Sequence, residues 1–250
     1  MMKLKLPVIH GVIRRRLLIN YRADPEVVQK LLPGLFRPKL HAGFAIVGIC
    51  LIRLENIRPS RIPRRMGINS ENAAHRIAVQ WDDENGETRD GVYIPRRDTS
   101  SRLNHYAGGR FFPGEHHLSN FEIIEDSEGV HFSMKGSDGF MEIRVDGYDG
   151  EESAFPQSSC FDSLTQASTF FESGSDGYSV SSDPGRLDGI RLDVQNWQVK
   201  PLLVTHLASS FYDDVSKFPK GSITFDHALV MRDIAHRWLS LEDIHTCCPQ

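Results

Sequence analysis

The chain has 250 residues, 40% of them hydrophobic, and can therefore bury one substantial core. No apolar run approaches the roughly 18 residues of a membrane-spanning helix, so we expect no membrane partner. The net charge is −4, yet residues 1–66 carry 14 Lys and Arg against 3 Asp and Glu. A basic arm that binds nucleic acid would explain this imbalance. Because the basic residues are mixed with Leu, Ile and Val, we expect instead that strands from both halves share one domain and that nucleic acid is not a partner.

Cysteine usage and the N-terminal stretch indicate a cytoplasmic protein without a cofactor. Cys50 and Cys160 lie in or beside apolar stretches, and the other two cysteines lie in residues 241–250, which we expect to be a loose tail. No CxxC spacing occurs, so neither a zinc site nor a disulfide framework is indicated. Residues 1–16 are basic but lack an apolar run long enough for a signal peptide.

Between residues 14 and 95 the pattern favours strands, with one helix. Asp24 can cap that helix, Pro25 suits its first position, and Pro33 followed by glycine ends it. Asn85-Gly86 is a strong hairpin signal, because a type I′ turn needs positive φ at two successive residues. The expected strands are residues 14–22, 44–52, 76–81 and 88–95, with a surface loop at 56–70.

Residues 90–121 are rich in arginine, histidine and aromatic residues, and we expect the functional site in this part of the chain. After a strand and a polar turn, Asp98 or Thr99 can cap a short helix. That helix is predicted to point Leu103 and Tyr106 inward, and a pair of glycines ends it.

The rest of the chain predicts mainly strands and one clear helix at residues 159–172. Phe161, Leu164, Ala167 and Phe171 recur there at helical spacing and predict a buried stripe. Residues 224–239 fit either a strand or a helix, and periodicity alone does not decide between them. The expected strands are residues 118–124, 130–135, 140–148, 177–182, 187–194 and 202–207.

Many short strands separated by turns, with only two or three helices, predict a mainly antiparallel sheet. At this length, the edges of such a sheet are best removed by closing it into a barrel. We therefore expect a mainly β (α+β) chain that folds over residues 1–250 as a single closed antiparallel β-barrel domain with a few short helices.

Two adjacent histidines are the first candidates for chemistry. His116 and His117, with Glu115 beside them, resemble part of a metal site, but adjacent residues of a strand point to opposite faces. A third ligand is not identifiable by spacing, so we expect a hydrogen-bonded loop and no metal. No GxSxG elbow, catalytic-cysteine signature, P-loop or GxGxxG occurs, so acyl transfer and nucleotide binding have no sequence support.

Arginines in apolar strands are the second group of candidates. Alternation sends Arg14 and Arg16 to one face of their strand and Arg15 to the other. An arginine inside a closed sheet needs an anionic partner or ligand, whereas an exposed strand end would need neither. Glu71, His75 and Arg76 similarly lie at the start of an expected strand, where it would enter the mouth of the barrel. This polar cluster suits a small anionic ligand, and a surface set of salt bridges explains it nearly as well.

Four segments of the chain resemble the acetoacetate decarboxylase superfamily, and most closely its branch of uncharacterised bacterial domains. The resemblance implies a closed antiparallel β-barrel or cone with a central pocket, and assembly into a homodimer or larger homo-oligomer. The segments are YRADPEVVQKLLPG at 21–34, GVYIPRRDTSSRLNHYAGGRFF at 91–112, STFFESGSDGYSV at 168–180 and FDHAL at 225–229.

The resemblance also implies a difference in chemistry. The decarboxylases form a Schiff base between a β-keto acid and a lysine. The pKa of that lysine is lowered, because only the neutral amine can attack the carbonyl. In that family the reactive lysine follows a helix and a glycine. Here Gly109-Arg110 is followed by FFPGEHHL, which contains no lysine. Lys135, one strand later, is the nearest substitute, and lysines are almost never fully buried.

We therefore expect a pocket that binds a small anionic organic molecule without Schiff-base decarboxylation. Arg14 lies roughly where the resemblance places an arginine, and Glu71 lies near where it places a carboxylate. Arg14 would meet the anion, with Glu71, Arg110, His116 and His117 at the mouth of the pocket. One alternative is an enzyme acting on an oxo-acid-like substrate, in which His116 or His117 is the general base together with Glu71. Another is a protein-interaction module whose interior is filled by apolar side chains.

Overall fold

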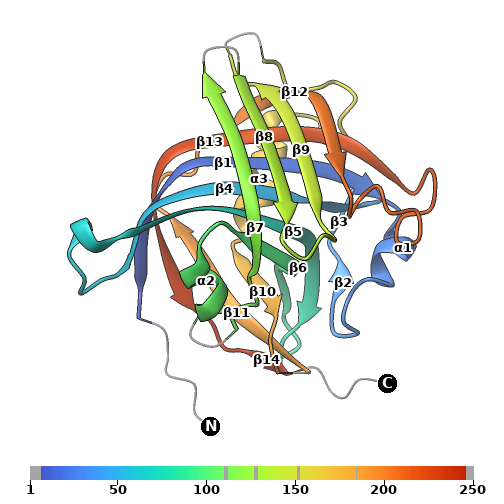
Figure 1. Cartoon of the computed structure of the whole chain (residues 1–250). Helices are drawn as coiled ribbons and strands as arrows, with labels where there is room; N and C mark the ends of the chain where they lie inside the picture. The colour runs from blue at the N-terminus through green and yellow to red at the C-terminus, as the bar shows by residue number, and fades with distance from the viewer. Residues whose placement is uncertain (1–6, 110–111, 127–128, 151–152, 184, 246–250) are drawn as a thin grey trace.

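The computed structural model describes residues 7–109, 112–126, 129–150, 153–183 and 185–245, and is built mainly of β-strands (Figure 1). Three α-helices and one 3-10 turn occur in this part of the chain: α1 (Pro25–Gln29), η1 (Arg64–Met66), α2 (Arg102–Ala107) and α3 (Leu164–Ser173). The strands are β1 (Ile9–Ala23), β2 (Arg37–Pro38), β3 (Leu40–His41), β4 (Phe44–Pro59), β5 (Ile68–Asp82), β6 (Thr88–Thr99), β7 (His117–Asp126), β8 (Gly129–Gly136), β9 (Glu142–Tyr148), β10 (Asp176–Val180), β11 (Arg186–Val194), β12 (Lys200–Ser209), β13 (Ile223–Ser240) and β14 (Ile244–His245). The prediction of a mainly β chain with few helices is confirmed.

Seven strands pair side by side until the last returns to the first. The order around this ring is β1, β4, β5, β6, β10, β11 and β13, and β13 pairs again with β1. All of these pairings are antiparallel except that of β6 with β10. A second path leaves β6 through β7, β8, β9 and β12 and returns to β13. In Figure 1, β7, β8 and β9 cross in front of β13, β1 and β4.

The shared strands separate two interiors of different character. Leu17 and Ile19 of β1 face β7, β8 and β9, where they join a large apolar cluster that includes Phe132 and Ile143. Leu18, on the opposite face of β1, packs with residues of α3 in a smaller cluster. Side chains of the first cluster fill the space under β7–β9, and the cavity described below lies on the second face.

A bulge in β1 decides which of its arginines points where. The register between β1 and β4 shifts between Ile13 and Arg15, so that Arg14 is extra with respect to the β4 ladder. An extra residue of this kind inverts the facing of the side chains before it relative to those after it. Ile13 and Arg16 therefore share one face of the sheet, Arg15 lies on the other, and Arg14 projects to the surface.

Local capping chemistry accounts for the helix starts. The Asp24 side chain accepts a hydrogen bond from the Glu26 amide, and Pro25 occupies the first turn, as predicted, although α1 ends at Gln29 before the expected Pro33. In α3, the predicted buried stripe is confirmed at Ala167 and Phe171.

Two sequence predictions for α2 are wrong. Ser101 caps this helix by accepting from the Asn104 amide, because the predicted caps, Asp98 and Thr99, still belong to β6 and are buried. Leu103 and Tyr106 are 58% and 66% exposed. They do not point into a core, because α2 lies over the rim of the cavity described below rather than inside a packed layer.

Tertiary pairing resolves the remaining ambiguities. The undecided region 224–239 is strand β13, which pairs with β1, β11 and β12. The expected loop at 56–70 is shorter than predicted, since β4 extends to Pro59 and β5 starts at Ile68. Among the described residues, no helix has the length and apolar character needed to cross a membrane.

Candidate ligand-binding site

A cavity of about 520 Å³ lies inside the seven-strand ring. Every strand of the ring contributes to its wall, and Phe171 of α3 and Trp197 close part of it. The wall is largely apolar. Examples from four strands are Ile52, Ile94, Ile190 and Trp238. A mostly apolar cavity of this size with a few polar groups is typical of small-molecule sites.

Five arginines line this largely apolar cavity. Arg58 donates to the Asn56 carbonyl and Arg191 pairs with Asp176, whereas the other three are Arg16 of β1, Arg76 of β5 and Arg97 of β6. The guanidinium of Arg76 donates to the Asn20 side-chain oxygen and lies 4.7 Å from the ring centre of Phe171. Arg97 Nε donates to Ser179 Oγ at 2.8 Å. Among the described residues, none of these three arginines forms an ion pair with a carboxylate.

Burial lowers the pKa values of two of these arginines, but not far enough to deprotonate them at neutral pH. It lowers the pKa of both Arg76 and Arg97 to about 10. Both remain protonated near neutral pH, so the cavity contains uncompensated positive charge. A buried charge without a partner is costly, and Arg76 Nε has no hydrogen-bond acceptor among the described residues. The arrangement is suited to an anion supplied from outside the chain.

Cys50 of β4 lies among the arginines. Arg16 Nε is 3.3 Å from Cys50 Sγ, and the same guanidinium lies 5.6 Å from the ring centre of Trp197. The thiol is unpaired and 8% exposed. Alkylation of this thiol can therefore report on occupancy of the cavity.

His116 is the predicted site residue that lines the cavity. Its Nδ1 donates to the Gly114 carbonyl at 3.0 Å, which leaves Nε2 without a proton. Burial and the nearby Arg97 lower the pKa of His116 to about 3. The imidazole is therefore neutral at physiological pH and is a very weak base, so it suits hydrogen bonding to a ligand better than proton abstraction.

The other predicted site residues lie away from the cavity wall. His117 is 41% exposed and faces Asp138 at 3.6 Å, so the two histidines diverge as alternation predicts. Lys135 is exposed on β8. Arg110 lies outside the described residues. None of the described residues that line the cavity is a lysine.

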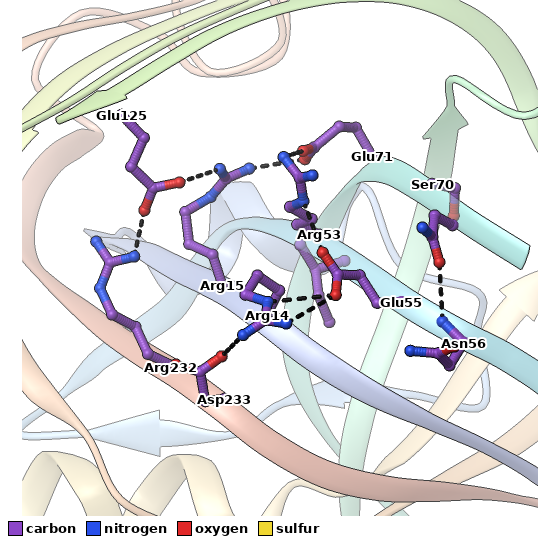
Figure 2. Close-up of polar contacts among 12 residues, drawn as sticks. Arg14, Arg15, Arg53, Glu55, Asn56, Ser70, Glu71, Glu125, Arg232 and Asp233 are labelled. Atoms are coloured by element: carbon purple, nitrogen blue, oxygen red, sulfur yellow. Dashed lines mark hydrogen bonds and ion pairs between the residues drawn. The ribbon is translucent and has the colours of Figure 1, made fainter. Parts of the chain in front are cut away.

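Arg14 and Glu71 belong to a charged network on the opposite side of the sheet (Figure 2). Arg15, fully buried, lies 2.7 Å from Glu71 and 3.0 Å from Glu125. Figure 2 shows the chain of contacts continuing from Glu125 to Arg232 and from Glu71 to Arg53. Arg14, 51% exposed, pairs with Glu55 and Asp233. Each carboxylate here already has an arginine partner.

The β1 arginine in the cavity is therefore Arg16, and the expectation that Arg14 would point there does not match its position. The bulge at Arg14 is the physical reason. Sequence reasoning named Arg16 and Arg76 as candidates but missed Arg97. The period-2 pattern of Val92 and Ile94 would have selected Arg96, and a register shift between β5 and β6 brings Arg97 to the cavity instead.

The ring, its two interiors and its cavity define a protein of the acetoacetate decarboxylase-like fold. The structure is similar to acetoacetate decarboxylase from Legionella pneumophila, with a TM-score of 0.59 at 12% identity over 97% of this chain and 90% of that one. It is equally similar to an acetoacetate decarboxylase-like enzyme from Sphingomonas wittichii RW1, with a TM-score of 0.59 at 11% identity over 98% and 95% of the two chains. The enduracididine biosynthesis enzyme MppR, complexed with pyruvate, gives a TM-score of 0.56 at 10% identity over 98% and 92%.

The chain belongs to the DUF2071 family, described as an uncharacterized conserved protein, whose model matches residues 12–214. The resemblance predicted from the sequence is thus confirmed. A search of curated proteins finds no match.

Proposed function

We propose that the protein binds a small anionic organic molecule in the cavity inside the strand ring. The observation that carries the proposal is the group of three arginines, Arg16, Arg76 and Arg97, which face one apolar cavity without a carboxylate partner among the described residues. Binding an anion there would offset the cost of their burial. MppR, of similar fold, is complexed with pyruvate, and this supports a small oxo-acid as the type of ligand.

The proposal excludes Schiff-base decarboxylation. That chemistry requires a neutral lysine amine at the substrate. The segment that would supply it in the family runs from Gly109 to Leu118 without a lysine, and Lys135 is exposed on a different strand. His116 takes part as a neutral hydrogen-bonding group at the ligand.

Of the other predicted ligand-binding residues, we assign Arg14 and Glu71 to the charged network beneath β7. An acid–base enzyme that uses Glu71 with His116 or His117 would need these side chains to converge. Glu71 faces Arg15 on the other side of the sheet, so that alternative has less support than binding alone.

The experiment is a thermal-stability titration with small oxo-acids, using wild type, Arg16→Met and Arg14→Met. The two arginines lie two residues apart on β1, and Arg14 is the matched control outside the cavity. A bound acid at 100 times its Kd should stabilise the wild type and Arg14→Met by about 2.7 kcal/mol and leave Arg16→Met unchanged. No response in the wild type, or an equal response in Arg16→Met, would refute the proposal.

Borohydride treatment in the presence of pyruvate tests the proposed absence of Schiff-base chemistry. We expect no mass increase on any lysine. A covalent adduct on a lysine would show that Schiff-base chemistry has been retained. Assembly into a homo-oligomer remains a prediction, which light scattering of the purified protein would test.

A further inference from the structure

The cavity holds more positive charge than one carboxylate can offset. Besides these three arginines, its wall includes two further arginines and three carboxylates: Arg58, Arg191, Asp98, Glu172 and Asp193. Asp98 and Asp193 pair with arginines outside the wall, Arg191 pairs with Asp176, and Glu172 is exposed. Asp188 raises the pKa of Arg97 through space, but its oxygens accept from Arg186 Nε at 3.3 Å and from the Gly114 amide at 3.0 Å. Glu172 can offset one positive charge, so Arg16, Arg76 and Arg97 together still leave an excess of positive charge.

The arginines occupy two ends of the cavity. Arg16 and Arg76 form one end, on the side of β1: Arg16 is a residue of β1, Arg76 donates to the Asn20 side chain of β1, and Arg16 is close enough to lower the pKa of Arg76. Cys50 acts electrostatically on Arg97 as it does on Arg76, so the two ends are distinguished by the partners of the guanidinium groups. This end is lined by the aromatic rings of Trp197 and Phe171, over which the two guanidinium groups lie.

Arg97 forms the other end. Its Nε is held by Ser179 of β10, and it acts electrostatically on His116. Cys50 pairs with Ala74 of β5, and Ala74 pairs with Arg97 of β6. Two strand spacings therefore separate the Cα atoms of Cys50 and Arg97, which is about 10 Å. The contact of Arg97 with β10 directs its charge further from Arg16.

Much of the remaining wall is apolar or small, as at Ile52, Ala74, Val92 and Ile94, and Asn72 adds a neutral polar group. A ligand that spans the cavity would thus meet a cation, then an apolar wall, then a second cation.

We propose that the ligand is a dianion, with two anionic groups joined by a short apolar segment, as in a linear dicarboxylate. One group is bound by Arg16 and Arg76 and the other by Arg97. This inference rests on the proposed function and narrows the ligand class from small organic anions to organic dianions.

The test compares acids of equal length that differ only in the second charge. Glutarate, adipate and suberate are titrated against pentanoate, hexanoate and octanoate by calorimetry at constant pH and ionic strength. Because each charge-assisted contact adds affinity, we expect the best dicarboxylate to bind at least about tenfold more tightly than its monocarboxylate. A ratio below about fivefold overturns the inference.

A pair of variants assigns the second charge to its partner. In Arg97→Gln, the dicarboxylate should fall to the affinity of the monocarboxylate, while the monocarboxylate keeps its own. Arg89→Gln is the matched control, because Arg89 lies on the same strand at the surface and pairs with Asp83. Retention of the full dicarboxylate preference in Arg97→Gln would refute the assignment.

Cys50 provides a readout that needs no variant. We expect adipate, but not hexanoate at equal concentration, to slow alkylation of Cys50 by iodoacetamide, with the partly exposed Cys160 as the internal reference. Equal rates of Cys50 alkylation with both acids would contradict the inference. If neither acid series binds at all, the proposed function fails too, whereas equal binding of both series refutes only the dianion.

Discussion

Replacing Arg15 with methionine should destabilise the protein far more than the same replacement of its neighbour, Arg14. Arg15 is fully buried and makes contacts of 2.7 Å and 3.0 Å to Glu71 and Glu125. Loss of one partner from a buried ion pair generally costs about 3–5 kcal/mol, because it leaves the other charge uncompensated.

The structure places Arg15→Met at the lower end of that range. Glu71 keeps Arg53 at 3.5 Å, and Glu125 keeps Arg232, so neither carboxylate becomes an isolated charge. Methionine also preserves most of the apolar volume that Arg15 packs against Phe132. We expect a loss of about 3 kcal/mol in the free energy of unfolding. Arg14→Met removes ion pairs from a side chain that is 51% exposed, and should therefore cost much less than Arg15→Met.

Urea unfolding followed by tryptophan fluorescence measures both variants. The free energies are compared at pH 7 and at one ionic strength, since salt screens the Arg14 pairs more than the buried ones. A loss below about 1 kcal/mol for Arg15→Met, or a larger loss for Arg14→Met, would refute the reasoning.

Three further predictions concern buried groups outside the cavity wall. Burial lowers the pKa of His75 to about 3, so the stability it contributes is present above the unfolded pKa of roughly 6.5 and is lost as the pH falls toward 3. His75→Phe should therefore reduce the fall in unfolding free energy between pH 7 and pH 5 by about 2 kcal/mol, and an unchanged pH profile would contradict this. Tyr212→Phe removes a hydroxyl whose one proton is donated between the Gly48 carbonyl at 2.8 Å and the Arg76 carbonyl at 3.2 Å, and should cost about 1–2 kcal/mol in urea unfolding. In Gly48→Ala, the new Cβ would lie 2.2 Å from the Ile19 carbonyl oxygen, so we expect a melting temperature lowered by more than that of Tyr212→Phe.

Local chemistry predicted much of the secondary structure. The Asp24-Pro25 start of α1, the hairpin at Asn85-Gly86 between β5 and β6, and the buried stripe of α3 each depend on a few adjacent residues, so the sequence is sufficient to recognise them. The expected type I′ turn is wrong, because Gly86 has positive φ but Asn85 does not, and the loop spans residues 83–87. The region 224–239 could not be assigned in this way. Its extended form is set by pairing with β1, β11 and β12, which are distant in the sequence.

The candidate site was harder to predict because it depends on which face of the sheet each single side chain occupies. Each register shift inverts the alternation of a strand, and shifts occur beside both Arg14 and Arg96. The alternation rule therefore favoured Arg14 equally with Arg16, and it gave no reason to select Arg97. His116 was found because its neighbours in the chain, a helix end and a glycine pair, already indicated an ordered loop.

The contrast between Arg15 and Arg16 is what makes the cavity informative. On one face of β1, the chain supplies two carboxylates for the buried Arg15. One residue later, on the other face, Arg16 contacts sulfur atoms and an aromatic ring, and no described carboxylate pairs with it. A carboxylate at Ile52 or Ala74, which both line the cavity, would have compensated the arginines internally. These positions are apolar or small instead, so the wall keeps both the positive charge and the space that an anion from solution would occupy.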